Sequence, residues 1–266
     1  MDIRVDGATA FAATGGRAFD PNLPVTVFVH GAAFDHTVWK LQARYFAWKG
    51  GSVLAVDLPG HGRSEGPPRP SIPAMADWLV ALMDAAEIGE ANLVGHSMGA
   101  LVAMDAAARH GVRVRKLALL GAAPAIPVND LLLSRSAEDD HHALELLTGW
   151  GYGRRAHYGG HRMPGMWMTG GGLRTLERAA PGVLHADLVA TNEYESGEAA
   201  AAAVACPSLV VIGARDLMTP AKRGHALAAM LPNSTTVVIP QAGHIMLDEE
   251  PDATLDALRD FLVDAS

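Results

Sequence analysis

The sequence has little of what several classes of protein depend on. It contains one cysteine, Cys206, which cannot form an internal disulfide and so gives no sign of an oxidising compartment. It has no run of 18 apolar residues, so we expect no membrane span. Its first residues are polar and lack the apolar segment of a signal peptide. We therefore expect a cytoplasmic protein.

Positive charge is also scarce. The 266 residues include 21 Lys and Arg against 29 Asp and Glu, a net charge of −8, and the basic cluster at residues 113–116 is short. A nucleic-acid-binding protein normally carries a basic patch. The charge balance therefore argues against a nucleic-acid partner. The 49% of hydrophobic residues is ordinary for a globular chain with a sizeable core.

Apolar runs alternate with amphipathic stretches along much of the chain. Runs typical of strands buried on both faces occur at residues 25–29, 52–56, 92–94, 116–120, 209–212 and 235–239. Helical patterns occur at residues 75–88, 97–110, 220–231 and 253–263. This alternation predicts an α/β fold with a mostly parallel sheet that helices cover on both faces. Residues 2–19 are expected to add an antiparallel hairpin at one edge, with a turn near residues 14–16.

The alternation stops between residues 124 and 205. This stretch is rich in glycine and histidine and shows only helical patterns, near residues 137–148, 173–180, 183–191 and 197–205. We therefore predict a core formed by residues 1–123 and 206–266, and a helical insertion at 124–205 that covers one end of the sheet. The methionine-rich segment at residues 163–168 is expected to supply part of an apolar pocket wall.

The sequence Gly-His-Ser-Met-Gly at residues 95–99 lies between a predicted strand and a predicted helix. A sharp turn at this place would raise the Ser97 hydroxyl above the sheet, and Gly95 and Gly99 would let chain segments approach closely. The helix that follows would place backbone amides near the hydroxyl, where they favour developing negative charge. The motif therefore predicts that Ser97 is a nucleophile.

A serine hydroxyl needs a base, and the base needs an orienting partner. His244 lies in the loop after the last predicted strand, and Asp216 follows the strand before it. Both are expected at the same end of the sheet as Ser97. Asp248 and Glu249 are less suitable partners because a chain entering a helix would carry them away from the imidazole. His96 is interpreted as structural because its backbone directs it away from Ser97.

Five segments in this order resemble the α/β-hydrolase superfamily, in the group of small cofactor-independent serine esterases. They are residues 29–33, 57–64, 95–99, 213–216 and 242–244. The resemblance implies that the insertion is a cap or lid over the site and that no cofactor is needed. It also implies an oxyanion hole made by the backbone amides of Met98 and Ala32, with Ala33 as the second choice for the latter. His30 and His61 would then shape the surrounding loops.

We predict a serine hydrolase that cleaves carboxylic esters, or related thioester, lactone or amide bonds, through an acyl-enzyme on Ser97. The same triad serves C–C bond hydrolases of ring-cleavage products, for which we expect a lid cation that holds a substrate carboxylate. The arginines of the insertion leave this alternative open; they are Arg154, Arg155, Arg162, Arg174 and Arg178. A cofactor-free perhydrolase or haloperoxidase also stays open, although the insertion argues against it. Dehalogenases and epoxide hydrolases use an aspartate nucleophile, which Ser97 does not match.

The alternative outside enzymes is a ligand-binding protein or receptor on the same fold. Five histidines of the insertion lack the spacing and setting of a zinc site, so we expect no metal; they are His141, His142, His157, His161 and His185. The expected partner is a small ester-like molecule, not a nucleic acid or a membrane. The sequence is compatible with a homodimer and leaves the oligomeric state open.

Overall fold

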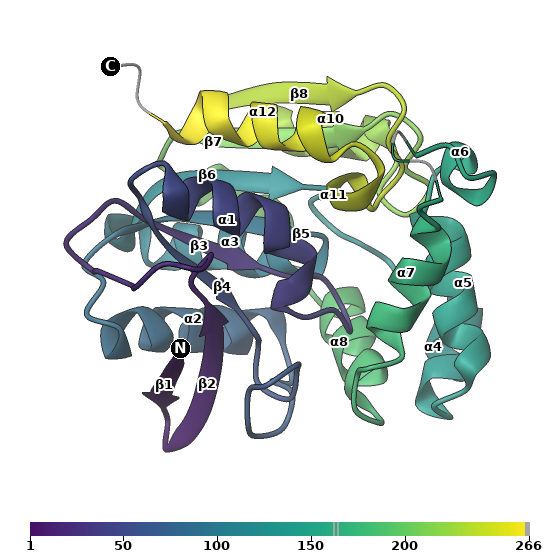
Figure 1. The fold of residues 1–266 in the computed structure, drawn as a ribbon, viewed down its shortest axis with the longest axis horizontal. Coiled ribbons are helices and arrows are strands. Elements are labelled where there is room, and N and C mark those ends of the chain that lie inside the picture. The colour runs from purple at the N-terminus through teal and green to yellow at the C-terminus, as the bar shows by residue number, and fades with distance from the viewer. Residues whose placement is uncertain (162, 164, 264–266) are drawn as a thin grey trace.

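The computed structural model describes residues 1–263 except 162 and 164, and within this part an eight-stranded sheet forms the centre of the molecule (Figure 1). The strand order is β1-β2-β4-β3-β5-β6-β7-β8. Neighbouring strands from β4 to β8 pair in parallel, whereas β1 and β2 form an antiparallel hairpin that joins β4. The strands are β1 (Asp2–Val5), β2 (Ala8–Ala13), β3 (Val25–Val29), β4 (Ser52–Val56), β5 (Ala91–His96), β6 (Val114–Leu120), β7 (Ser208–Gly213) and β8 (Ser234–Ile239). The predicted α/β fold is confirmed.

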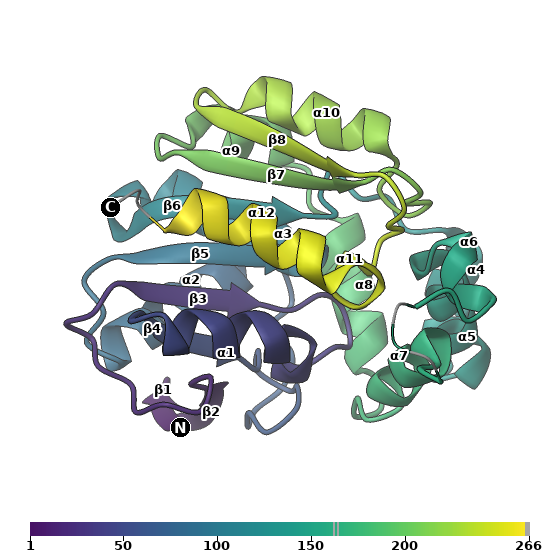
Figure 2. The same ribbon diagram turned by 45° about the horizontal axis from the view of Figure 1, so that its top comes forward.

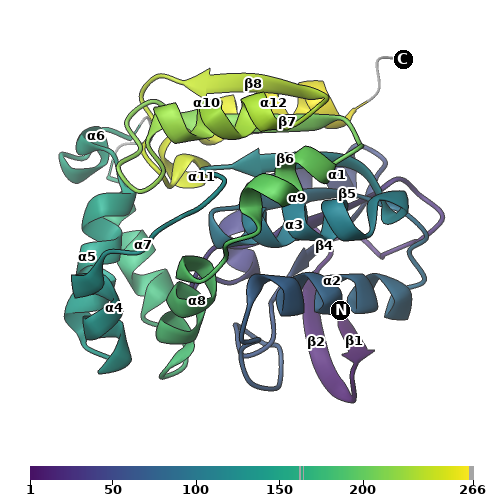
Figure 3. The ribbon, with the colours of Figure 1, turned by 180° about the vertical axis from the view of Figure 1, so that it is seen from behind.

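Helices cover both faces of the sheet because the central strands are apolar on both faces. Every residue of β3, β4, β5 and β7 is buried. Figure 2 shows α1 and α12 over one face, and Figure 3 shows α2, α3, α9 and α10 over the other. Their bounds are α1 (Lys40–Trp48), α2 (Ile72–Ala85), α3 (Met98–Arg109), α9 (Gly197–Ala203), α10 (Ala221–Met230) and α12 (Pro251–Leu262). Each face forms its own hydrophobic cluster against the sheet.

Five further helices stand together at the end of the sheet to which the parallel strands point (Figure 1). We call these the lid helices: α4 (Asp130–Ala137), α5 (His141–Gly151), α6 (Arg154–His157), α7 (Met168–Leu176) and α8 (Val183–Asn192). Residues from α4, α5, α7 and α8 form a third hydrophobic cluster with Phe34 and Ile245 of the core. The helix at 197–203, which also belongs to the predicted insertion, instead packs on α3 through Ala200 and Ala201.

Several predicted boundaries were wrong for local reasons. The hairpin turns at Asp6 and Gly7, which have positive φ, whereas the predicted turn near residues 14–16 is present but follows β2. Asp139 also has positive φ and the Asp140 side chain accepts a hydrogen bond from the His142 amide, so the helix expected at 137–148 is divided between α4 and α5. α7 begins several residues before the predicted 173, through three consecutive glycines.

The ends of the core helices also differ. α2 begins at Ile72 because Ser71 caps it, and it ends at Ala85. α1 was not predicted, and short helices precede it at His36–Trp39, follow α3 at Gly111–Arg113 and precede α12 at Met246–Glu249 (α11). Within the described residues, no helix has both the length and the apolar character needed to cross a bilayer.

Candidate active site

Ser97 lies at a sharp turn between β5 and α3. Its backbone has φ 55° and ψ −121°, a conformation that residues other than glycine rarely adopt. A Cβ atom at Gly95 would collide with the Gly99 carbonyl, and one at Gly99 would collide with the carbonyls of Val29 and His30. The turn therefore needs glycine on both sides of the serine because the backbones of β3, β5 and α3 approach closely here.

The loops after β7 and β8 bring Asp216 and His244 into contact. His244 Nδ1 lies 2.8 Å from Asp216 Oδ2, and both side chains are buried. Asp216 Oδ1 accepts hydrogen bonds from the amides of Met218 and Thr219, each at 2.8 Å. Burial alone would raise the pKa of Asp216, but His244 and the hydrogen bonds from Thr219 lower it below its usual value. The carboxylate is therefore ionised and accepts the Nδ1 proton, which leaves the Nε2 lone pair of His244 free.

Ser97 shares a pocket with His244 but is not hydrogen-bonded to it. The Nε2 atom of His244 is buried and has no hydrogen-bond partner within the described residues. Both Ser97 and His244 line the same cavity. Such hydrogen bonds are often long in the absence of substrate and tighten when it binds. In the structure, Asp216 and His244 are therefore in direct contact, and Ser97 lines the same cavity as His244.

Two neighbours hold this arrangement, and neither was predicted from the sequence to act on His244 or Asp216. Thr219 Oγ1 donates at 2.6 Å to Asp216 Oδ2, the same oxygen that faces His244, and so helps to hold the carboxylate in place. His96 Nε2 lies 2.8 Å from the His244 carbonyl oxygen. Burial lowers the pKa of His96 to about 3, so this ring is neutral and donates from Nε2. The only sequence signal for the contact between Thr219 and Asp216 was the position of the threonine, three residues after the aspartate.

The predicted oxyanion donors lie in the wall of the same cavity. Met98 is the first residue of α3, so its amide has no acceptor inside the helix. The Ala32 amide donates no backbone hydrogen bond within the described chain. The Ala33 amide, our second choice, instead donates to Asp187 of α8 at 2.8 Å. The geometry therefore favours Ala32 over Ala33 as the partner of Met98.

His30 orients the Ala32 amide through the peptide bond that precedes it. The Leu58 amide donates to His30 Nε2 at 3.1 Å, so the ring proton is on Nδ1, which donates to the Gly31 carbonyl at 2.9 Å. Burial lowers the pKa of His30 to about 4, which is consistent with a neutral ring. Because the Gly31 carbonyl and the Ala32 N–H belong to one peptide plane, the hydrogen bond from His30 also sets the direction of that N–H.

The cavity between the core and the lid helices is apolar. It has a volume of about 370 Å³ and lies over Ser97. The lid contributes side chains such as Leu132, Leu147, Leu176 and Leu188. Among the residues that the structure describes, no Asp, Glu, Lys or Arg lines it. The surroundings of Ser97 therefore suit an uncharged, hydrophobic group.

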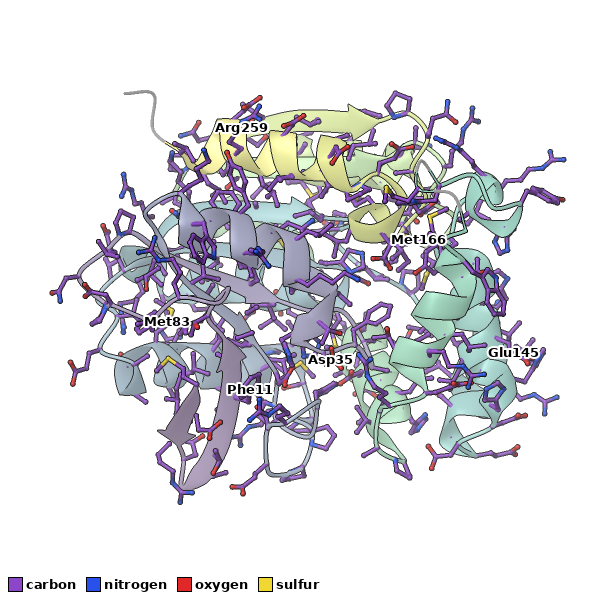
Figure 4. The ribbon with its side chains drawn as sticks, viewed as in Figure 1. Phe11, Asp35, Met83, Glu145, Met166 and Arg259 are labelled. Carbon is purple, nitrogen blue, oxygen red and sulfur yellow. The ribbon has the colours of Figure 1, made fainter. Side chains whose placement is uncertain are left out.

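The methionine-rich segment does not line this cavity as we expected. Met163, Met166 and Trp167 are exposed, and Met168 is buried among the lid helices. Figure 4 places Met166 in the loop beside α6 and α7. Pro164 lies outside the described residues. Leucines of α4, α5, α7 and α8 line the cavity instead, because these helices turn apolar residues toward the core.

Glu249 connects the His244 loop to the lid. Its carboxylate accepts hydrogen bonds from the amides of Gly153, at 2.8 Å, and Gly243, at 3.0 Å. Burial raises the pKa of Glu249 to about 7, against the two amides, which lower it. The His244 amide also donates to the Gly151 carbonyl at 2.8 Å. The segment between α5 and α6 of the lid is therefore hydrogen-bonded to the loop that carries His244.

One group of residues has the composition of a metal site. The side chains of Asp35, His36 and Asp57 converge, and Figure 4 shows Asp35 on the side of the core that faces the lid helices. Protein donors already occupy these carboxylates: Asp57 accepts from the amides of His36 and Arg63, at 2.7 and 2.9 Å, and Asp35 accepts from Arg178 at 2.8 Å. This cluster braces the loop after β3, and the expectation of a site without metal stays a prediction.

Comparisons with known proteins show which family the chain belongs to. A family model described as the alpha/beta hydrolase fold matches residues 24–251. The pimeloyl-[acyl-carrier protein] methyl ester esterase of Chromobacterium violaceum is 31% identical over 81% of this chain and 83% of its own. The (E)-2-((N-methylformamido)methylene)succinate hydrolase of Acinetobacter baylyi is 24% identical over 89% of each chain.

A solved structure with a similar fold is the enol-lactonase of Burkholderia xenovorans. It superimposes with a TM-score of 0.88 at 25% identity, and the match covers 98% of this chain and 99% of that one. The fold, the order of the motifs and the family model all indicate the same family. The chain therefore belongs to the α/β-hydrolase fold family and is a hydrolase.

Proposed function

We propose that the protein is a serine hydrolase that cleaves carboxylic esters with an uncharged, apolar acyl group. The observation that carries this proposal is the Asp216–His244 pair, which lies with Ser97 at one cavity that lacks charged side chains among its described lining residues. The relatives named as a methyl ester esterase and an enol-lactonase, both of which act on acyl–oxygen bonds by name, support the same bond type.

The proposed reaction has two halves. His244 Nε2 takes the proton of the Ser97 hydroxyl while Oγ forms a bond to the ester carbonyl carbon, and the carbonyl oxygen becomes an anion held by the amides of Ala32 and Met98. The intermediate collapses with loss of the alkoxide, which receives the proton from His244. Water then attacks the acyl-enzyme, again losing a proton to His244, and the carboxylic acid leaves with Ser97 restored. Asp216 stabilises the imidazolium in each half.

Four of the five arginines that kept C–C bond hydrolysis open are engaged elsewhere. Arg155 pairs with Glu250 at 2.8 Å, Arg174 with Glu177 at 2.5 Å, and Arg178 with Asp35 at 2.8 Å. Arg154 lies over the ring of Tyr158, and Arg162 lies outside the described residues. A substrate carboxylate would therefore enter a cavity where it loses water without gaining a cationic partner from these four, which is unfavourable.

A substrate panel tests this proposal. We expect turnover of p-nitrophenyl esters with neutral aliphatic acyl chains. A p-nitrophenyl hemiester ending in a free carboxylate should react at least about tenfold more slowly than its methyl-capped counterpart, because the charge is desolvated without compensation. A vinylogous diketo acid should not be cleaved.

The nucleophile is tested with a matched pair of serine variants. Ser97→Ala should lower kcat by at least about 10³-fold and abolish labelling by a fluorophosphonate. Ser134→Ala, at an exposed position of α4, should match the wild type in both measurements. Ester turnover that persists in Ser97→Ala at the wild-type rate would overturn the proposal, and so would cleavage of the diketo acid in preference to every ester.

A further inference from the structure

A buried ion pair joins the lid to the core directly beneath the candidate oxyanion loop. Asp187 of α8 is fully buried, and its Oδ2 lies 2.8 Å from Nε2 of His61, which is 2% exposed. The same oxygen accepts the Ala33 amide at 2.8 Å. The reaction proposed above assigns no role to either side chain.

The surroundings of His61 require a charged ring. Its Nδ1 faces the Pro59 carbonyl at 3.0 Å, and its Nε2 faces the Asp187 carboxylate. A carbonyl and a carboxylate only accept, so both nitrogens must donate, which makes His61 an imidazolium. Burial opposes the charge, but Asp187, the Pro59 carbonyl and Asp57 outweigh it and raise the pKa of His61.

Joining α8 to the core in this way is costly. Two charges have been taken out of water, and Asp187 Oδ1 has no hydrogen-bond partner within the described residues. An apolar contact would join the elements without that cost. Besides its pairing with His61, the carboxylate supplies an acceptor for the Ala33 amide, which an apolar side chain cannot.

The Ala33 amide lies in the loop that holds the Ala32 amide. Ala33 has φ +56°, an unusual conformation for a residue with a side chain, and Phe34 N–H closes the turn on the Gly31 carbonyl at 3.2 Å. His30 therefore fixes the peptide plane before Ala32, and Asp187 fixes the plane after it. Because the peptide planes before and after Ala32 are both held in place, the Ala32 N–H points in a single fixed direction.

We propose that Asp187, paired with the His61 imidazolium, is a positioning residue that holds the Ala32 amide in the oxyanion hole, so that the hole is complete only when α8 is seated on the core. This proposal rests on the proposed function, because an oxyanion forms only if Ser97 attacks a carbonyl. Asp187 acts through the Ala33 amide and makes no contact with the reacting atoms.

Removal of the carboxylate tests the proposal. In Asp187→Ala we expect kcat for a p-nitrophenyl ester to fall about 10²-fold with KM within about twofold, because the loss of one oxyanion donor has an effect of this order. A trifluoromethyl ketone, which forms a hemiketal anion on Ser97, should bind more weakly by the same factor. Asp187→Asn keeps an acceptor for Ala33. Its kcat and its affinity for the inhibitor should therefore each be at least about tenfold higher than those of Asp187→Ala.

The pH profile provides a readout that does not depend on Asp187→Ala folding. The wild type should lose kcat at alkaline pH as His61 loses its proton and the pair breaks. Without a negative charge beside it, the buried His61 of Asp187→Asn should lose its proton at lower pH, so the alkaline decrease should begin at a lower pH than in the wild type.

Asp105→Asn is a matched control, since Asp105 is also buried and binds the Tyr194 hydroxyl at 3.0 Å, away from the oxyanion loop. It should lower the melting temperature without changing kcat or inhibitor affinity. The proposal is wrong if folded Asp187 variants keep wild-type kcat and inhibitor affinity, or if kcat falls while inhibitor affinity does not. Failure of the proposed function would appear separately, as wild-type protein without ester turnover or fluorophosphonate labelling.

Discussion

At the scale of single residues, the conformation of Ser97 opposes stability. Its φ of 55° and ψ of −121° form a backbone conformation that glycine adopts far more readily than serine, at a cost on the order of 1–3 kcal/mol. Ser97→Gly relieves this strain, whereas Ser97→Ala keeps it. We expect Ser97→Gly to be more stable than Ser97→Ala by about 1 kcal/mol in urea unfolding, although glycine usually destabilises a folded chain.

Ser134 provides a control at which the expected stability difference between the glycine and alanine variants has the opposite sign. It lies inside α4, where the backbone is helical, so Ser134→Gly should be less stable than Ser134→Ala by about 1 kcal/mol. The same order of stability at both positions would contradict a strained nucleophile.

At the scale of elements, the three consecutive glycines of α7 are not equivalent. A Cβ at Gly171 would meet no atom within 4 Å, whereas one at Gly172 would collide with the Tyr152 ring. We therefore expect Gly171→Ala to stabilise the lid by roughly 0.5–1 kcal/mol, because alanine loses less backbone entropy in a helix. The slowing of amide hydrogen exchange in α7 would measure this gain.

Gly172→Ala is the matched substitution. It should destabilise the protein and raise KM, because the new methyl group displaces Tyr152 from the cavity wall and from its hydrogen bond to Asp248 at 2.8 Å. Equal effects of the two alanines on exchange and KM would show that α7 does not pack as the structure describes.

At the scale of the whole molecule, Glu249 makes stability depend on pH. Its pKa of about 7 in the folded chain lies above the usual 4.5, so the folded state binds the proton more tightly. The resulting stabilisation is complete below about pH 4.5 and is lost as the pH rises through about 7. Relative to Glu249→Gln, the wild type should therefore lose about 2 kcal/mol of unfolding free energy between about pH 5.5 and pH 8.

Chemical unfolding of both proteins at the two pH values measures this difference. Glu138→Gln, at an exposed position of the lid, should follow the wild type at both. If the difference between wild type and Glu249→Gln does not change with pH, Glu249 is ionised throughout and only its hydrogen bonds to Gly153 and Gly243 matter.

Local patterns were sufficient to predict the sheet and the residues at its end. Strands buried on both faces are continuous apolar runs, so β3, β4 and β7 could be identified within a residue or two. Ser97 follows β5 directly, and Asp216 and His244 lie three and five residues after the ends of β7 and β8. α1 was missed although its buried residues recur with helical spacing, at Gln42, Ala43, Phe46 and Ala47.

The sequence alone determined the α/β fold, the turn at Ser97 and the loops that carry Asp216 and His244, because buried strands, close-approach glycines and strand ends all leave local patterns. Only the tertiary structure decided which amide of the 32–33 pair is free, which residues line the cavity, and that Asp187 reaches Ala33 across 154 positions of the chain. No local pattern encodes these contacts, since they depend on where the lid helices rest on the sheet.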